Sequence, residues 1–309
     1  MSVVVLAGGV GGARFVRALT EAVDPREVTV VANVGDDLEV LGLHVSPDLD
    51  TILYTLAGLG DEERGWGRRD ESWNALETAA ELGEDAWFKL GDRDVGLHLV
   101  RTQALLAGEP LSSVTRRLAE AVGLGVTLLP ATDDRLRTWV ETPAGAFEFQ
   151  EWFVRRGHQD RADAVRFEGG ETARPAPGVI DAISAADVIA IAPSNPFVSI
   201  APILAVRQIR EAIESRTVPA VAVSPLIGGR AVKGPADGMF TSLTGGTTPA
   251  DVARCYEGLI DALVFDQSDA DGAEAVAELG VRPVVTQTLM PEANGHLAEA
   301  VLDKAAALR

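Results

Sequence analysis

Short runs of β-branched and other apolar residues recur along the chain and are separated by segments of helical length. The runs lie at residues 3–6, 28–32, 188–192, 220–223, 263–265 and 284–286. Runs without polar alternation are typical of strands that are covered on both faces, as in a mainly parallel sheet with crossover helices. The pattern therefore predicts an α/β fold of the Rossmann-like, doubly wound class.

A long block with a different pattern of apolar and polar residues separates the second run from the third. It shows helical patterns at residues 50–59, 73–82, 95–107 and 111–121, a strand at 126–129, and a hairpin of residues 137–142 and 147–149. We interpret the chain as a single domain, residues 1–309, with a lid subdomain inserted at about residues 60–172. Ligands in open α/β sheets bind beyond the carboxyl ends of the strands, so functional side chains are expected just after each strand.

The segment after the first run is rich in glycine. It reads Ala7-Gly8-Gly9-Val10-Gly11-Gly12-Ala13-Arg14 and leads into a predicted helix at residues 15–22. Glycine lets backbone N–H groups approach an oxyanion closely, and a helix N-terminus carries about half a positive charge. The segment lacks the G-K-[ST] of a P-loop, and Arg14 stands where a dinucleotide fingerprint has Gly or Ala. It predicts a phosphate cradle, with a tight turn that binds nothing as the alternative.

Two acidic pairs follow the second run. Asp36 and Asp37 follow it after Asn33-Val34-Gly35, and Asp48 and Asp50 open the next predicted helix. Carboxylates beside a phosphate cradle are what a Mg²⁺ ion bridging a diphosphate requires, because Mg²⁺ prefers hard oxygen ligands. The alternative is that Asp48 or Asp50 caps the helix, while Asp36 and Asp37 are solvated turn residues.

Two further loops carry polar side chains at equivalent positions. Ser194 and Asn195 are held between two prolines after the third run, which suits them to read a base or ribose edge. After the fourth run, residues 224–230 and Lys233 offer backbone donors and cations suited to phosphate. A purely structural turn is the alternative for each loop.

The inserted block adds a polar pair and an aromatic loop. Asp94 and His98 are four residues apart, so they share one face if a helix begins there. Packing or solvation without a catalytic role is the alternative for His98. Trp66 lies between two glycines and is followed by two arginines, an arrangement that fits either the wall of a flat ring system or a surface loop.

Composition narrows the functional classes. The net charge of −19 argues against nucleic acid as a partner, because that binding depends on Lys and Arg neutralising phosphates. The single cysteine, Cys255, excludes an internal disulfide and a cysteine-based zinc cluster. No apolar run reaches the roughly 18–20 residues of a membrane helix. We expect a cytoplasmic protein that binds small molecules and no membrane; the oligomeric state stays open, a homodimer included.

Together the loops resemble one family closely: the 2-phospho-L-lactate transferases, also called phosphoenolpyruvate transferases, of coenzyme F-420 biosynthesis. The matching segments are residues 8–12, 33–37, 46–51, 65–67, 91–94 with His98, 129–134, 194–196 and 233–235. They span most of the chain in one order. The resemblance implies transfer of a phospholactyl or phosphoenolpyruvyl group from a guanosine-diphosphate-linked donor to the terminal ribityl hydroxyl of the deazaflavin Fo, with release of GMP.

The resemblance also implies roles for individual residues. The resemblance does not assign a general base, for which Asp50 is the first candidate and Asp94 the second. The remaining roles are acceptor binding by Asp50, Arg93 and His98; Mg²⁺ binding by Asp37 and Asp50; donor phosphate binding by Gly8, Gly9, Gly11 and Gly12; and the guanosine side of the donor by Ser194, Asn195 and Lys233. The choice between the lactyl and enolpyruvyl donors stays open.

Two other interpretations share the glycine-rich start. A related family of nucleotide-sugar-binding regulators typically continues with glycine and serines after the paired aspartates, whereas Leu38 follows here. A nicotinamide-dependent dehydrogenase would need a third glycine and an acidic residue at the end of the second strand, where this chain has Asn33. Both differences favour the transferase.

Overall fold

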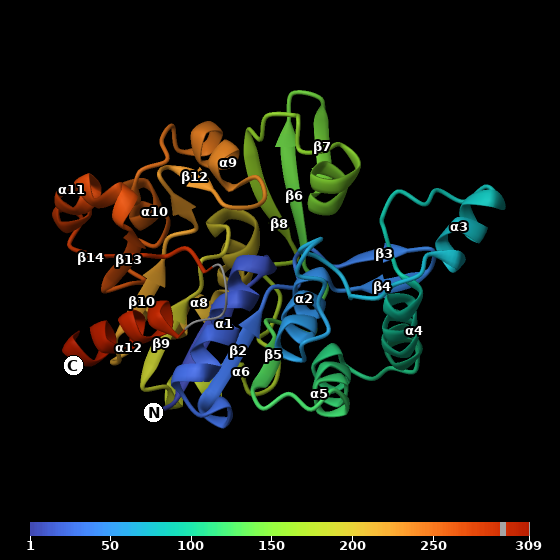
Figure 1. The fold of residues 1–309 in the computed structure, drawn as a ribbon, viewed down its shortest axis with the longest axis horizontal. Coiled ribbons are helices and arrows are strands. Elements are labelled where there is room, and N and C mark those ends of the chain that lie inside the picture. Colours follow the sequence, from blue (N-terminus) through green and yellow to red (C-terminus); the bar gives the residue numbers. More distant parts are fainter. Residues whose placement is uncertain (291–294, 309) are drawn as a thin grey trace.

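A parallel seven-stranded sheet forms the centre of the computed structural model, which describes residues 1–290 and 295–308. Its strand order is β14-β13-β10-β9-β1-β2-β5, and every neighbouring pair is parallel (Figure 1). The strands are β1 (Val3–Ala7), β2 (Val28–Ala32), β5 (Thr127–Pro130), β9 (Val188–Ile191), β10 (Ala220–Val223), β13 (Ala262–Asp266) and β14 (Arg282–Thr286). The predicted doubly wound α/β class is confirmed.

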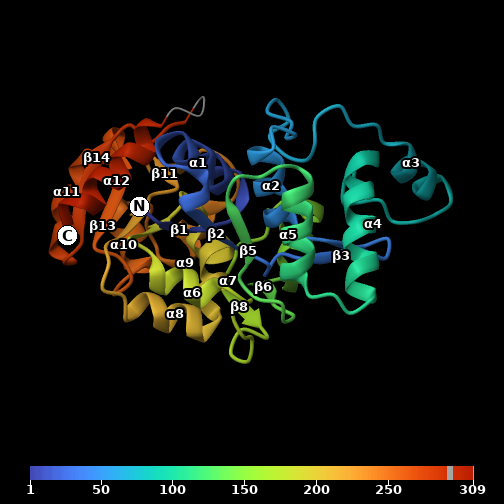
Figure 2. The ribbon, with the colours of Figure 1, turned by 90° about the horizontal axis from the view of Figure 1, so that it is seen from below.

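Helices cover both faces of this sheet. On one face α1 (Gly9–Ala22) packs between α2 (Pro47–Leu56) and α12 (His296–Leu308), and on the other α6 (Val179–Ala185) packs against α8 (Arg207–Glu214) (Figure 2). Residues of β1, β9, β10 and β13 are therefore buried on both sides, which explains their unbroken apolar sequence. The strand order reverses between β1 and β9, the switch point where such sheets bind ligands.

The block predicted as one insertion, residues 60–172, is not continuous. Its strand β5 pairs with β2 and forms an edge of the central sheet, with α5 (Leu111–Ala121) packed against it. The sequence pattern did not reveal this because a four-residue strand pairs through its backbone, which carries no sequence signal. The chain instead makes two separate excursions from the sheet.

The first excursion is an arm that projects to the right in Figure 1. It consists of the hairpin β3 (Leu38–Val40) and β4 (Leu43–Val45) with α3 (Asn74–Glu81) and α4 (Asp92–Leu106). The second is the antiparallel sheet β7-β6-β8, with a short helix at Glu151–Arg155. Its strands are β6 (Arg137–Thr142), β7 (Gly145–Glu148) and β8 (Ala164–Glu168), and the β6–β7 turn confirms the predicted hairpin.

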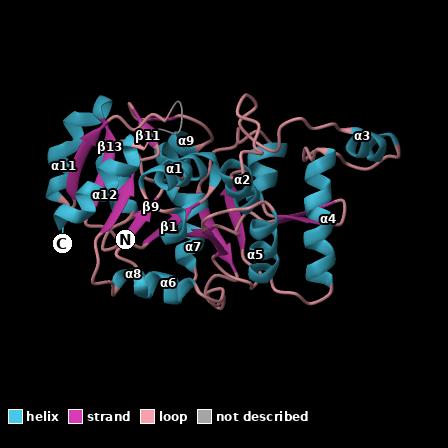
Figure 3. Ribbon diagram, turned by 60° about the horizontal axis from the view of Figure 1, so that its bottom comes forward, coloured by secondary structure: helices cyan, strands magenta, loops and turns pink. Residues whose placement is uncertain are grey.

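Apart from the short helix at Pro25–Glu27, the remaining elements lie in the second half of the chain (Figure 3). They are α7 (Ala201–Ala205), α9 (Ala236–Leu243), α10 (Pro249–Cys255), α11 (Ala273–Glu278), the hairpin β11 (Leu226–Ile227) and β12 (Arg230–Ala231), and short helices at Pro25–Glu27, Pro196–Ile200 and Gln267–Gly272. Within the described ranges, none of the helices has the length and apolar character required to cross a membrane.

Candidate active site

A single open cleft of about 770 Å³ lies beyond the carboxyl ends of β1, β2, β9 and β10. The loop after each of these strands contributes to its lining, as expected for the switch point of an open sheet. The lining includes Gly8, Gly9, Gly11, Asp36, Asp48, Asp50, Lys89, Asp94, His98, Ser194, Asn195, Ser224 and Lys233. Most of the residues that the sequence predicts for the site are thus brought together.

The glycine loop begins α1 immediately after β1, with Gly8 as the N-cap. A Cβ atom at Gly8 would lie 2.4 Å from Asp48 Oδ2, and one at Gly11 would lie 2.5 Å from the carbonyl oxygen of Pro193. Gly12 packs against Ser194 instead of lining the cleft, since its Cβ would meet Ser194 Oγ at 2.6 Å. The loop is therefore glycine-rich because neighbouring groups approach its backbone closely, and its role in phosphate binding stays a prediction.

Asp48 is buried and faces the glycine loop. Its carboxylate accepts hydrogen bonds from the Gly9 backbone N–H (2.8 Å) and from Asn33 Nδ2 (2.9 Å). It does not cap α2, whose N-cap is Ser46. Burial, with a further contribution from the charge of Asp37, raises the pKa of Asp48 to about 6. Asp48 therefore belongs to the cleft, and the capping alternative is wrong for this residue.

The other acidic pair is also buried, so its members are not solvated turn residues. Asp36 lines the cleft, and burial together with the charge of Asp48 raises its pKa well above the usual range. Asp37 lies behind it, where one carboxylate oxygen accepts a hydrogen bond from Ser46 Oγ (2.8 Å) and lies 2.9 Å from His44 Nε2. The Oδ1 atoms of Asp36 and Asp37 accept no hydrogen bond from any residue within 1–290 and 295–308.

Asp50 points from the first turn of α2 toward the arm. Its two oxygens accept a bidentate pair of hydrogen bonds from Arg101 of α4, with 2.9 Å between Arg101 Nη1 and Asp50 Oδ2. Both side chains are buried, and only Asp50 lines the cleft. Arg101 was not predicted from the sequence, because an arginine in an amphipathic helix usually faces solvent. Its spacing of three residues from His98 and seven from Asp94 was the available signal.

Asp94 and His98 lie on one buried face of α4, as their spacing predicts. His98 Nε2 is 3.2 Å from Asp94 Oδ1, at an angle outside ordinary hydrogen-bond geometry, and the hydroxyl of Tyr54 donates to the same oxygen. Burial works to raise the pKa of Asp94, but His98, Tyr54 and Arg101 outweigh it, so the pKa is lowered. A carboxylate with a lowered pKa is poorly suited to accept a proton, so the structure favours Asp94 as an anchor for Tyr54 and His98.

Arg93 is not brought into the cleft. It is exposed on α4, and its backbone N–H donates to Glu71 Oε2 (2.8 Å). Successive residues of a helix point about 100° apart, so a site that uses the Asp94 face does not include the Arg93 side chain. Lys89, just before the helix, lines the cleft and was not singled out from the sequence.

The residues predicted for the guanosine side of the donor also make contacts within the protein. Ser194 Oγ donates to the Gly8 carbonyl oxygen (2.8 Å), and the Asn195 side chain accepts from the Phe197 backbone N–H (2.9 Å). Lys233 Nζ donates to the Gly65 carbonyl oxygen (2.7 Å) and so joins two loops that both line the cleft. Burial and the positive charge of Arg14 lower the pKa of Lys233.

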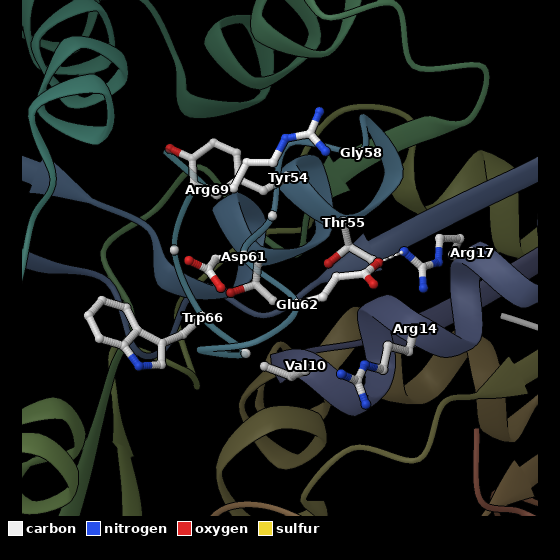
Figure 4. Close-up of a pocket in the computed structure, with 14 residues that line it drawn as sticks. Val10, Arg14, Arg17, Tyr54, Thr55, Gly58, Asp61, Glu62, Trp66 and Arg69 are labelled. Atoms are coloured by element: carbon white, nitrogen blue, oxygen red, sulfur yellow. Dashed lines mark hydrogen bonds and ion pairs between the residues drawn. The ribbon is translucent and has the colours of Figure 1, made fainter. Parts of the chain in front are cut away.

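A smaller pocket of about 160 Å³ adjoins the cleft between α1, α2 and residues 58–69 (Figure 4). Arg17 forms an ion pair with Glu62 across it, at 2.7 Å. Arg14, one turn earlier on α1, lines both the pocket and the cleft. Among the described residues no carboxylate forms an ion pair with it, so this arginine is free to bind an anion.

Comparison with known proteins shows which family the chain belongs to. A family model described as 2-phospho-L-lactate transferase CofD matches residues 3–294. Phosphoenolpyruvate transferases from Streptomyces griseus and Mycobacterium tuberculosis are 46% and 41% identical to it. The alignments cover 97% of this chain and 96% of the Streptomyces protein, and 99% of each chain for the Mycobacterium protein.

A solved structure supports the fold. The crystal structure of a UPF0052 family member from Bacillus halodurans has a TM-score of 0.66 at 19% identity, and the match covers 97% of this chain and 98% of the other. The sequence relatives are transferases. This finding argues against the two other interpretations of the sequence, a nicotinamide-dependent dehydrogenase and a nucleotide-sugar-binding regulator. This chain belongs to the CofD family of 2-phospho-L-lactate transferases.

Proposed function

We propose that this transferase moves a phospholactyl or phosphoenolpyruvyl group from a guanosine-diphosphate-linked donor to the terminal ribityl hydroxyl of the deazaflavin Fo, in coenzyme F-420 biosynthesis. The hydroxyl oxygen attacks the phosphorus that carries the three-carbon acid, the bond from that phosphorus to the GMP oxygen breaks, and GMP leaves. The observation that carries the proposal is one cleft that combines a glycine loop, buried carboxylates and an aromatic wall.

The donor is proposed to bind on the glycine side of the cleft. The N-terminus of α1 lines the cleft and favours an anion such as a diphosphate, although the Gly9 N–H itself donates to Asp48. Ser194, Asn195 and Ser224 follow β9 and β10 and line the same cleft, which supports a proposed role in contacting the nucleoside. In phosphoryl transfer, positioning and charge neutralisation dominate over covalent catalysis, so the proposed reaction requires no nucleophilic side chain.

The acceptor is proposed to bind on the aromatic side. Phe149 and Phe153 stack with ring centroids 5.4 Å apart and an interplanar angle of 6°. Together with Trp66 and Phe88 they line the cleft and offer flat apolar surface to a ring system. Asp50 remains our first candidate for the general base. The lowered pKa of Asp94 argues against it as the second candidate, since an effective base has a pKa near the working pH.

The acidic edge of the cleft fits a Mg²⁺ ion. Asp36 offers a buried oxygen that lacks a hydrogen bond from the described part of the chain, and Asp48 and Asp50 line the same cleft. No group of three His, Cys, Asp or Glu residues in the described ranges is already arranged as a metal site. Mg²⁺ commonly uses one or two carboxylates and completes its shell with water and substrate phosphates. When bound, it would neutralise charge on the diphosphate.

A transfer assay tests this function. The protein is incubated with Fo, Mg²⁺ and each of the two guanosine-diphosphate-linked acids, and the molecular masses of the products are measured by mass spectrometry. We expect product from both donors, because they share the guanosine, diphosphate and carboxylate, and discrimination at one sp²/sp³ centre is modest, roughly 1–3 kcal/mol. The names of the relatives favour the enolpyruvyl donor. Transfer from neither donor by the folded protein would reject the proposal.

Arg14 is expected to contribute to donor affinity. Arg14→Gln removes a cation that faces the cleft without an ion-pair partner in the described structure, so the dissociation constant for GDP should rise about tenfold, or ~1.4 kcal/mol. The measurement is isothermal titration with GDP. Arg17→Gln is the matched control, because Arg17 is already neutralised by Glu62. Equal affinities for the two variants would show that Arg14 does not contact the donor.

A further inference from the structure

A fully buried arginine lies behind the cleft without lining it. Arg101 is 1% exposed, and its partner Asp50 is 4% exposed. Removing two charges from water costs several kcal/mol per ion, and well-packed apolar residues of similar volume usually give equal or greater stability. The pair is therefore not explained by stability alone. A reason connected with the cleft is required, because Asp50 lines it.

The geometry of the pair restricts Asp50 strongly. The guanidinium of Arg101 donates from Nη1 to Asp50 Oδ2 (2.9 Å) and from Nη2 to Asp50 Oδ1. Such a two-point contact fixes the plane of the carboxylate as well as its position, which a lysine ammonium could not do. Each carboxylate oxygen keeps a second lone pair, so Asp50 can still face a ligand in the cleft.

A histidine holds the arginine in turn. His98 Nδ1 lies 3.3 Å from Arg101 Nη1 and 3.7 Å from Asp50 Oδ2. A guanidinium only donates, so Nδ1 must be the accepting nitrogen and the ring proton is on Nε2, the nitrogen that faces Asp94. The hydroxyl of Tyr54 completes the chain by donating to Asp94. The network connects α2, which carries Asp50 and Tyr54, with α4, which carries the other three residues.

We infer that Arg101 is a positioning residue, which fixes the carboxylate of Asp50 for the reaction and acts only through it. This inference rests on the proposed function for its kinetic consequences. The supporting observation is that Arg101 has no access to the cleft, while its bidentate contact determines how Asp50 enters the cleft.

A double-mutant cycle tests the dependence on Asp50. Arg101→Met is expected to lower kcat at least ~10-fold with little change in KM for the donor, and Arg101→Lys to recover part of the loss. Adding Arg101→Met to Asp50→Asn should change kcat by less than about twofold, because the route through Asp50 is already removed. Losses that multiply in the double variant would overturn the inference, as would wild-type kcat in Arg101→Met.

The matched control is Arg216→Met. Arg216 also pairs with an aspartate, Asp261, and its side chain is 9% exposed, but it does not line the cleft. This variant should melt at a lower temperature than the wild type and keep its kcat. If Arg101→Met does not fold, Arg101→Lys and the double variant still measure the coupling.

A second readout does not involve the substrates. The chain has four histidines, so the ¹⁵N resonances of His98 can be assigned with a His98→Gln variant. We expect the Nε2-protonated form in the wild type and a shifted tautomer balance in Arg101→Met, where Nδ1 loses its donor. An unchanged balance would overturn the geometry proposed for the network. Absence of transfer by the wild type would instead reject the proposed function and leave this result intact.

Discussion

The Asp50→Asn variant is expected to lose at least ~100-fold in turnover, equivalent to ~3 kcal/mol of transition-state stabilisation. The substitution changes the side-chain volume little but removes the charge that faces the cleft and pairs with Arg101. It also leaves Arg101 buried without a counter-charge, which costs roughly 3–5 kcal/mol of stability. The measurement is kcat with saturating substrates, at a temperature at which circular dichroism shows the variant folded.

The control for this prediction must lie outside the cleft. Asp48, two residues away, is unsuitable because it faces the glycine loop, and Asp48→Asn should also slow the reaction. Asp181→Asn is better matched, since Asp181 is an exposed residue in the first turn of α6 on the other face of the sheet. Turnover in Asp50→Asn equal to that of Asp181→Asn would refute the role of Asp50.

Removal of divalent cations is expected to reduce turnover to background. Asp36 and Asp48 repel each other beside the place proposed for the diphosphate, and a cation would relieve that repulsion. The assay compares protein treated with a chelator before and after Mg²⁺ is added back. Full turnover without added metal would contradict the Mg²⁺ proposal.

The same carboxylates give this prediction a pH dependence. The pKa of Asp48 is about 6 in the folded protein and about 3.8 in the unfolded chain, so between these values the folded state binds more protons. The stability that this additional proton binding gives the folded state is therefore lost as the pH rises from about 4 to about 6. A cation bound at Asp48 in place of the proton would restore that stability. The increase in melting temperature on adding Mg²⁺ should thus be larger near pH 7 than near pH 5, and a constant increase would argue against a cation at Asp48.

The central sheet could be predicted because its strands are buried on both faces. That environment leaves an unbroken apolar sequence, as in residues 188–191 and 220–223. The glycines and paired aspartates were recognisable because they follow β1 and β2, and such positions meet at one edge of a parallel sheet. These features depend on local sequence and on the general geometry of the fold.

The direction of individual side chains could not be predicted. Asp48 and Asp50 are two residues apart on α2, or about 200° around the helix, so one faces the glycine loop and the other faces α4. The predicted helix at 95–107 begins at Asp92 in the structure, and this placement leaves Arg93 exposed. Arg101 contacts Asp50 across 51 residues of sequence, a tertiary contact that no local pattern contains.

The exposed contact between Lys233 and Gly65 bears on where the cleft is expected to open. The arm is fastened to α2 by a buried ion pair, and separating such charges costs roughly 3–5 kcal/mol. The loops that carry Lys233 and Gly65 are joined by exposed hydrogen bonds from the Lys233 ammonium to the carbonyl oxygens of Gly65 and Arg64, which water can replace at a cost of about 1 kcal/mol each. By this difference we expect thermal motion to part the two loops more often than it lifts the arm, and we propose the gap between them as the route by which substrates enter the cleft and products leave it.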